Sequence, residues 1–286
     1  MRVVKLSLIS VAVLSSVACA SQHSTYNHVD DSVIAEQRAA LAANTEGKDF
    51  GPQSPRDLET LSGNNTRMFN AAPSHTEMNL CNIHFHVSAE HRGGEFTTYA
   101  GNGDGQGHHS GYVYNGRLPS AHLQTPSRAI CEGPKGGLKA GDTIEVHYVF
   151  TSALITPGPT LAACFSESTM NPQLRVESQV YVLVSDEDAL DFQELTAFGE
   201  RNGYQQALNI PSNTGTPIRY AGSTTGHTYN TLGSPLQVSW SVRPKVAYVN
   251  IESVGEWCDS NPFNETTAHG VRNLVVNPDL ISDIEQ

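Results

Sequence analysis

The segment from residue 81 to residue 87 constrains the fold more than any other, because apolar and polar side chains alternate along it. Side chains of an extended strand point alternately to its two faces, so His84 and His86 lie on the same face. The other face must pack against a core, and it consists of Cys81, Ile83, Phe85 and Val87. We therefore expect an anchored strand that presents two imidazoles side by side, well placed to share a metal ion.

A second alternating segment, residues 143–150, offers a third imidazole. Its apolar face consists of Ile144, Val146, Tyr148 and Phe150. The opposite face carries Glu145 and His147, and we predict that His147 is the third metal ligand beside His84 and His86. Glu145 is expected to accept an N–H from a ligand histidine and so to select its tautomer. Three neutral imidazoles leave the fourth position of a tetrahedral zinc site open to water, as in catalytic zinc sites.

Two other interpretations of these residues compete with this one. The spacing His84-x-His86-x3-Glu90 also occurs in cupin metal sites, in which Glu90 would bind the metal and His147 would lie far from it. The rest of the cupin pattern is missing, because no glycine lies six residues before His84 and no Gly-x2-His-x3-Asn motif follows. The second alternative is an exported protein that binds a metal or a partner without catalysing a reaction.

The N-terminus has the features of a secretory signal peptide. Arg2 and Lys5 precede an apolar run, residues 6–18, which is too short to span a bilayer. We expect residues 1–20 to be removed by cleavage after Ala20, and the protein to be periplasmic or secreted. Attachment as a lipoprotein through Cys19 is the alternative. No other segment is apolar over a membrane-spanning length, so we expect no transmembrane segment.

The charge of the mature chain argues against some classes of partner. The formal net charge of the full sequence is −12, and loss of the positive charges of Arg2 and Lys5 with the leader brings it to −14. So acidic a chain is not expected to bind nucleic acid or an anionic membrane surface.

Four cysteines remain after cleavage, and an even number in an oxidising compartment indicates two disulfides. Three pairings are open, and we predict Cys81 with Cys258 and Cys131 with Cys164. The cysteines are widely spaced and form no Cys-x-x-Cys motif, which disfavours a thiolate metal site.

The composition and the hydrophobic pattern of the sequence change near residue 76. Residues 21–75 are polar and are expected to form an N-terminal arm or linker, with a short helix over residues 31–43. From residue 76 to 286, short alternating segments are separated by Gly and Pro, as in a catalytic domain built mainly from β-strands. The expected strands include residues 143–150, 178–184, 236–242 and 246–251, with a turn or bulge at Pro244, and residues 186–199 are the best further helix candidate.

The predicted fold class is therefore mainly β, a β-rich α+β fold. It is expected to be a single compact domain of short, mostly antiparallel strands with a flexible N-terminal arm.

Several separate blocks of the sequence resemble the delta-class carbonic anhydrases. The first is Asn79-Leu-Cys-Asn-Ile-His-Phe-His-Val-Ser-Ala-Glu-His91, and the others are residues 175–184, 220–226, 238–245, 257–259 and 269–274. The resemblance covers the chain from about Met78 to Leu280. It implies the reversible hydration of carbon dioxide to bicarbonate and a proton, on Zn²⁺ (or Co²⁺ or Cd²⁺) held by three histidines. The positions that match this role are His84, His86 and His147.

The resemblance also implies a mechanism through a metal-bound hydroxide. Zinc lowers the pKa of its bound water to about 7 in carbonic anhydrase, which is the reference case for this effect. His91 is our candidate for the proton shuttle, because an unperturbed histidine has a pKa near neutrality. His108 and His109, in the Gly-rich stretch of residues 101–111, are alternatives.

Three further residues complete the predicted site. Glu90 is expected, like Glu145, to accept an N–H from a ligand histidine if it does not bind the metal itself. Thr224, or its neighbour Thr225, is expected to hydrogen-bond the hydroxide and orient its lone pair. Two histidines, His227 and His269, receive no role from the sequence.

Overall fold

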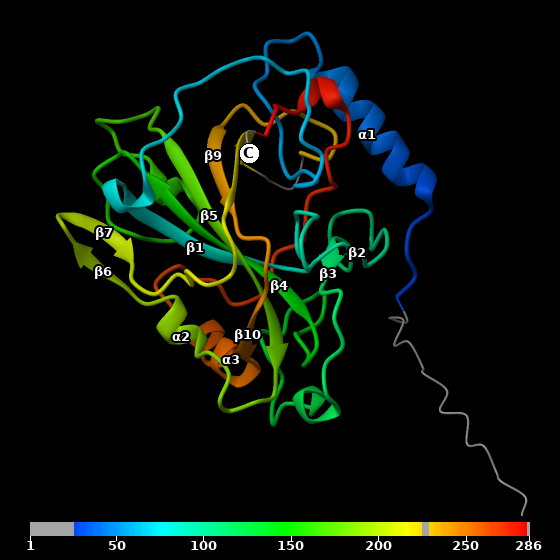
Figure 1. Ribbon diagram of the computed structural model, residues 1–286, viewed down its shortest axis with the longest axis vertical. Coiled ribbons are helices and arrows are strands. Elements are labelled where there is room, and N and C mark those ends of the chain that lie inside the picture. The colour runs from blue at the N-terminus through cyan, green and yellow to red at the C-terminus, as the bar shows by residue number, and fades with distance from the viewer. Residues whose placement is uncertain (1–25, 225–228, 285–286) are drawn as a thin grey trace, which may run out of the picture.

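The computed structural model describes residues 26–224 and 229–284, and a twisted sheet lies at its centre (Figure 1). Within these residues the sheet has six strands. Five follow the order β1 (Asn79–Val87), β4 (Thr143–Thr151), β5 (Leu174–Val184), β9 (Gln237–Val242) and β8 (Ile218–Ser223), and β10 (Ala247–Asn250) also pairs with β5. The mainly β fold with mostly antiparallel pairing is confirmed.

Strand β5 is long enough to pair with two shorter strands in succession. Residues 175–178 pair with β9 and residues 181–184 pair with β10, in both cases in parallel. The break between β9 and β10 lies at Pro244, as the sequence predicts, because a residue without an N–H cannot continue a ladder. The side chain of Gln179 spans the gap and donates to the carbonyl oxygen of Lys245 at 3.0 Å.

Smaller elements surround the sheet. Two short antiparallel pairs consist of β2 (Thr98–Tyr99) with β3 (Tyr112–Val113) and β6 (Phe198–Arg201) with β7 (Tyr204–Ala207). The 3₁₀ helices are η1 (His75–Glu77), η2 (Ser120–Leu123), η3 (Leu161–Cys164) and η4 (Pro278–Leu280). None of the helices in the described ranges is long and apolar enough to cross a membrane.

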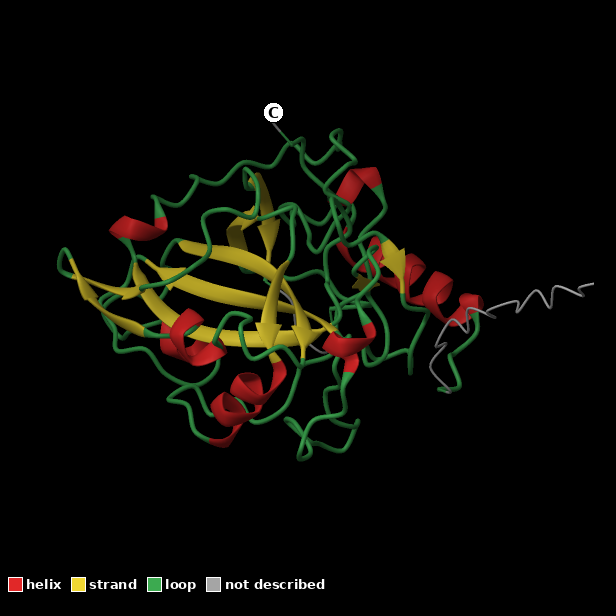
Figure 2. Cartoon of the chain, turned by 60° about the horizontal axis from the view of Figure 1, so that its bottom comes forward, coloured by secondary structure: helices red, strands yellow, loops and turns green. Residues whose placement is uncertain are grey.

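Helices α2 (Phe192–Leu195) and α3 (Ile251–Asp259) cover one face of the sheet (Figures 1 and 2). The core under them combines Phe192 and Trp257 with the apolar side chains that alternation assigned to one face of β1 and β4. Those strand residues are Ile83, Phe85, Ile144, Val146, Tyr148 and Phe150. Asn250 begins α3, because its side chain accepts the N–H of Ser253 at 3.0 Å. The opposite face of the sheet carries the polar residues of β1 and β4 together with a second apolar cluster that includes Val149, Val176 and Trp240.

The helix expected over residues 186–199 is reduced to the single turn of α2, so that prediction is wrong over most of its length. Before the turn, Leu190 pairs with Val249 as an extension beside β10. The turn begins at Asp191, which caps two backbone N–H groups, and ends at Thr196, whose hydroxyl bonds the carbonyl of Phe192 at 2.7 Å. Tertiary pairing on both sides therefore outweighs the helix propensity of this stretch. The helix predicted over residues 31–43 is confirmed as α1 (Asp31–Thr45).

Residues 26–58 pack closely against the domain, whereas the sequence predicts a polar arm that contributes little to the core. In α1, Ile34 and Leu41 are buried, and Leu41 packs against the C-terminal residues Val275, Leu280 and Ile281. Farther along, Gln53, Ser54 and Arg56 are fully buried. Most of residues 59–71 are exposed, in keeping with their polar composition. The predicted signal peptide lies outside the described residues.

The predicted disulfide pairing is wrong, because Cys81 is bonded to Cys164 and Cys131 to Cys258. Cys131 and Cys258 belong to the core beneath the helices, whereas Cys81 and Cys164 belong to the core on the other face. The sheet thus separates each pair of predicted partners.

A β-bulge explains why Cys81 is on that second face. The pairing of β1 with β4 shifts register between Leu80 and Asn82, so Cys81 is an extra residue. It therefore departs from the alternation and does not share the face of Ile83 and Phe85. No pattern in the sequence marks this extra residue.

Candidate metal centre

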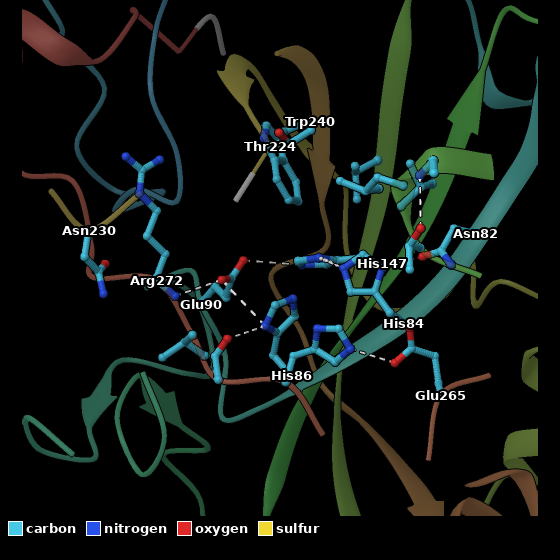
Figure 3. Close-up of a pocket in the computed structure, with 18 of the residues that line it drawn as sticks. Asn82, His84, His86, Glu90, His147, Thr224, Asn230, Trp240, Glu265 and Arg272 are labelled. Carbon is cyan, nitrogen blue, oxygen red and sulfur yellow. Dashed lines mark hydrogen bonds and ion pairs between the residues drawn. The ribbon is translucent and has the colours of Figure 1, made fainter. Parts of the chain in front are cut away.

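The pairing of β1 with β4 brings the three predicted histidines together (Figure 3). His84 lies directly opposite His147, and His86 lies opposite Glu145. The ring centroids are 5.3 Å apart for His84 and His86, 5.1 Å for His84 and His147, and 4.7 Å for His86 and His147. One nitrogen of each ring lies within 4.8 Å of the other two, so a single ion can contact all three.

The second nitrogen of each histidine ring is held by a separate acceptor. His84 Nδ1 donates to Asn82 Oδ1 at 2.7 Å, and His86 Nδ1 donates to the carbonyl oxygen of Gly270 at 2.9 Å. His147 Nε2 donates to Glu145 Oε1 at 2.9 Å. These partners assign the protons, so lone pairs remain on His84 Nε2, His86 Nε2 and His147 Nδ1.

These three lone pairs fit a divalent cation. His86 Nε2 is buried and has no hydrogen-bond partner, which is costly unless something binds it. His84 Nε2 and His147 Nδ1 face each other at 3.3 Å, an arrangement that a cation near both would stabilise. Three imidazole nitrogens with fixed tautomers are a typical donor set for zinc.

Burial keeps the three rings neutral. It lowers the pKa of His86 to about 3, and it lowers the pKa of His84 well below its ordinary value, with a further contribution from the neighbouring histidines. The pKa of His147 is lowered as well, because burial outweighs the favourable charge and hydrogen bond of Glu145. Neutral imidazoles have free lone pairs, so the site is prepared for metal at neutral pH.

Glu145 is the most fully hydrogen-bonded side chain of the site. It is completely buried and accepts five hydrogen bonds, from the backbone N–H groups of Glu90 and His91 and from the side chains of His91, His147 and Ser178. Burial raises the pKa of this carboxyl, but the electrostatic interactions and hydrogen bonds with His91 and His147 outweigh burial and hold the pKa well below its usual range. The prediction that Glu145 orients a ligand histidine agrees with this geometry.

His91 lies away from the position that a proton shuttle needs. Its ring is fully buried, with Nδ1 donating to Glu145 Oε1 at 2.7 Å and Nε2 accepting the hydroxyl of Tyr220 at 2.7 Å. Both nitrogens are thus occupied within the protein, and the ring does not line the cavity described below. Its geometry is that of a group that holds Glu145 in place.

Glu90 lies beside the three histidines rather than among them. Its Oε1 accepts the backbone N–H of Arg272 at 2.9 Å, and its nearest approaches to the histidines are 3.6 Å from His86 Nδ1 and 4.0 Å from His147 Nε2. Those nitrogens face away from the shared position. Because His147 is close and Glu90 does not converge with the lone pairs, the arrangement disfavours the cupin-like alternative. Burial raises the pKa of Glu90, and its Oε2 is unpaired.

The three histidines open onto a cavity of about 380 Å³ (Figure 3). Its apolar lining residues are Val149, Leu161, Ala162, Val176, Trp240 and Val271. Glu90, Thr224 and Arg272 contribute polar groups. A small apolar molecule can therefore lie against one wall while its reactive end reaches the histidines.

Of the other residues predicted for the site, only some lie near the three histidines. Thr224 lines the cavity, and its Oγ1 contacts Ser234 Oγ at 3.3 Å. Thr225 and His227 lie outside the described residues. His109 stacks on Tyr26 at a centroid distance of 3.6 Å, and neither it nor His108 lines the cavity.

Sequence reasoning missed several groups that the structure places at the site. Asn82 shares the face of His84 two residues away, so alternation could have identified it. The carbonyl of Gly270 is 184 residues from His86 and has no such signal. His269 is half-exposed at the cavity wall and forms a hydrogen bond with Glu265 Oε2 at 2.6 Å. Burial lowers the pKa of His269, but the hydrogen bond and the charge of Glu265 outweigh burial, so the pKa is raised.

The chain was compared with solved structures and with curated proteins. A carbonic anhydrase of the alpha class from Thermovibrio ammonificans, in complex with sulfanilamide, is 15% identical and aligns over 79% of this chain and 83% of that chain, with a TM-score of 0.27. The alpha-carbonic anhydrase of Photobacterium profundum is 15% identical over 87% and 96%, with a TM-score of 0.27. A halotolerant carbonic anhydrase from Dunaliella salina is 14% identical over 91% and 96%, with a TM-score of 0.31. The comparison with curated proteins gives no match.

These TM-scores are too low to indicate a shared fold or activity. The sequence family is the evidence for what kind of protein this is. The family model for the delta carbonic anhydrases matches residues 75–253, which include β1, β4, β5 and all three histidines. This match spans more than half of the chain and agrees with the geometry of the site. The chain therefore belongs to the delta carbonic anhydrase family of enzymes.

Proposed function

We propose that the protein is an exported zinc enzyme that catalyses the reversible hydration of carbon dioxide to bicarbonate and a proton. One observation carries the proposal: three imidazoles of fixed tautomer, those of His86 and His147 buried, each place a free nitrogen within 4.8 Å of the other two, in the lining of a cavity with apolar side chains. The family match supports the same reaction.

His84, His86 and His147 would hold the ion through Nε2, Nε2 and Nδ1. When bound, a divalent ion of this kind acidifies a coordinated water and so supplies a nucleophile at neutral pH. Nitrogen ligands in this number suit Zn²⁺, and Co²⁺ or Cd²⁺ are expected to substitute for it. Glu145 keeps the proton of His147 on Nε2 and so keeps Nδ1 free for the ion.

The apolar wall orients the substrate and excludes water. Val149 and Val176 come from neighbouring strands, and Trp240 closes the wall with its indole N–H donating to Ser54 Oγ and to the carbonyl of Ser223, both at 3.1 Å. Carbon dioxide has no hydrogen to donate and is suited to such a surface. Thr224 lines the same cavity and remains our candidate for a hydrogen bond to the reacting oxygen atom, and Glu90 lines it as well.

Export is supported by the cysteines as well as by the leader. Both disulfides are buried in the core and join residues far apart in the sequence, and such bonds persist in oxidising compartments. We propose that the protein is periplasmic or secreted, with lipoprotein attachment through Cys19 as the alternative.

The test combines metal analysis of the purified mature protein with stopped-flow measurement of carbon dioxide hydration. His147→Ala is expected to lose most of the bound zinc and the activity. His122→Ala is the matched control, because His122 lies in η2 and contacts Asp186, away from the cavity. Unchanged zinc content and rate in His147→Ala would refute the three-histidine site. Stoichiometric zinc without hydration activity in the wild type would show a metal-binding protein that is not a catalyst.

A further inference from the structure

One wall of the cavity is attached at both of its ends to two adjacent residues of β1. The wall segment, Gly158–Cys164, contributes Thr160, Leu161 and Ala162 to the cavity. At its first residue, the N–H of Gly158 donates to the carbonyl of Cys81 at 3.0 Å, and the carbonyl of Gly158 accepts from Asn82 Nδ2 at 3.1 Å. At its last residue, Cys164 forms the disulfide with Cys81.

The β-bulge in β1 makes this double attachment possible. In a regular strand the side chains of residues 81 and 82 would point to opposite faces. Because Cys81 is the extra residue of the bulge, its sulfur lies on the same face as Asn82, where both contact the wall segment. Bulges of this kind re-aim side chains next to functional sites.

Asn82 also contacts a metal ligand with the other end of its amide. Its Oδ1 accepts the Nδ1–H of His84 at 2.7 Å, while its Nδ2 donates to Gly158. Asn82 is 1% exposed, so bulk water has little access to either contact. A movement of the wall segment would therefore rotate the amide and with it the imidazole of His84.

We propose that Asn82 is a positioning residue that couples the orientation of His84 to the wall segment Gly158–Cys164, and that the Cys81–Cys164 disulfide maintains this coupling. The inference rests on the three-histidine metal site proposed above. It adds that metal affinity at this site depends on a wall that does not touch the metal.

The first test measures metal affinity, with Co²⁺ as the probe, by its absorption spectrum and by competition with a chelator. Asn82→Ala removes both contacts, and its Co²⁺ affinity is expected to fall about 10- to 100-fold, the usual effect of removing the partner of a ligand histidine. Asn82→Asp keeps an acceptor for His84 but loses the donor to Gly158. Its Co²⁺ affinity is expected to lie between those of the wild type and Asn82→Ala, because His84 keeps an acceptor that is no longer connected to the wall, and amide hydrogen exchange in residues 158–164 should become faster.

Asn79→Ala is the matched control on the same strand. Asn79 is also buried and also makes two hydrogen bonds, donating to the carbonyl of Ala153 and accepting from the N–H of Gln205, both at 3.0 Å. It does not contact a histidine, so Asn79→Ala should bind Co²⁺ like the wild type even if it is less stable. Equal affinities for Asn82→Ala and Asn79→Ala would overturn the positioning role.

The second test addresses the disulfide with a double-mutant cycle. Replacing Cys81 and Cys164 by serine is expected to weaken Co²⁺ binding in the wild-type background and to add little in the Asn82→Ala background, because the two act through one connection. Replacing Cys131 and Cys258, which form the disulfide on the other face, should leave the affinity unchanged. Additive losses would overturn the coupling, and the Asn82 variants, which keep both disulfides, decide the positioning role even if a cysteine variant fails to fold.

Failure of the inference differs from failure of the proposed function. If the wild type binds no Co²⁺, or if His147→Ala binds it equally well, the three-histidine site is wrong. If the wild type binds Co²⁺ through the histidines and the Asn82 variants bind it just as well, only the coupling is wrong.

Discussion

The two faces of the β1–β4 pair are built from alternate residues of the same two strands, yet they are stabilised in opposite ways. On the face beneath α2 and α3, Phe85 and Tyr148 pack among other apolar side chains. On the opposite face, His86 and Glu145 are almost as deeply buried but are held by hydrogen bonds. The first face gains stability from burial itself, whereas the polar groups of the second, which lie beside apolar residues such as Val149, can be buried only because they find partners.

This difference separates stability from function along a single strand. Phe85 and His86 are neighbours in the sequence, but one contributes to the core and the other to the metal site. A substitution on one face should therefore change the unfolding free energy with little effect on metal affinity, and a substitution on the other face should do the reverse. The predictions below test that separation.

The largest effect is expected for Phe85→Ala. Phe85 is fully buried, with ring centroids 6.1 Å from Phe192 and 5.9 Å from Trp257. The cavity left behind should lower the unfolding free energy by about 3–5 kcal/mol, measured by urea denaturation with both disulfides intact. The folded fraction should bind Co²⁺ as the wild type does. A large loss of affinity without a loss of stability would contradict the separation of the two faces.

His86→Ala should show the reverse behaviour. Loss of a ligand is expected to weaken Co²⁺ binding by more than about 100-fold, because even loss of a ligand's hydrogen-bond partner weakens binding by about 10- to 100-fold. The metal-free protein should lose only about 1 kcal/mol, since His86 makes one hydrogen bond and leaves its other nitrogen unpaired. Chelator competition and urea denaturation of the same samples measure both quantities. A stability loss as large as that of Phe85→Ala would show that the face is structural.

A smaller effect is expected at the start of α3, which covers the apolar face. Asn250→Ala removes the cap that accepts the N–H of Ser253 and also a hydrogen bond to the carbonyl of Asp186 at 2.9 Å. We expect a loss of about 1 kcal/mol in unfolding free energy. Zinc content and hydration rate should not change, and a change in either would mean that the helices influence the metal site through the sheet.

Two carboxyl groups, one in β4 and one just before it, show how hydrogen-bond partners decide whether a buried polar group stabilises the fold. Glu145 has five donors and a pKa well below its usual range. Asp142 accepts the N–H of Lys139 at 2.8 Å, and burial raises the pKa of Asp142 to about 6. An acid with a raised pKa in the folded state destabilises the fold as it ionises. For Asp142 this cost is absent below about pH 4 and complete above about pH 6.

Asp142→Asn is therefore expected to be more stable than the wild type at pH 7, by roughly 1 kcal/mol, and no more stable at pH 4. Urea denaturation at both pH values measures the difference. An advantage that does not depend on pH would show that the substitution acts through the turn at residues 139–142 rather than through charge.

The parts of the molecule that follow from local alternation could be predicted from the sequence. Strand β4 appears at the expected residues, with His147 and Glu145 on one face and Ile144 and Val146 on the other. The three histidines could be grouped because strands of the same pattern place them on one face. The pairing that sets His84 opposite His147 depends on register, which the sequence alone does not specify.

The errors arise where tertiary contacts override the local pattern. The bulge at Cys81 re-aims one side chain and changes both disulfides. The helix expected over residues 186–199 gives way to pairing beside β10. His91 resembles a shuttle in the sequence, but the fold buries it between Glu145 and Tyr220. Each of these depends on a partner far away in the sequence.

The hydrogen bond from His86 to Gly270 has a consequence for the order of events during folding. A chain that ends before Gly270 would contain all three histidines but would lack the acceptor that assigns the proton of His86. It would also lack Val275, Leu280 and Ile281, which pack on α1. Tight metal binding should therefore be one of the last steps of folding, because it requires these C-terminal residues to be in place.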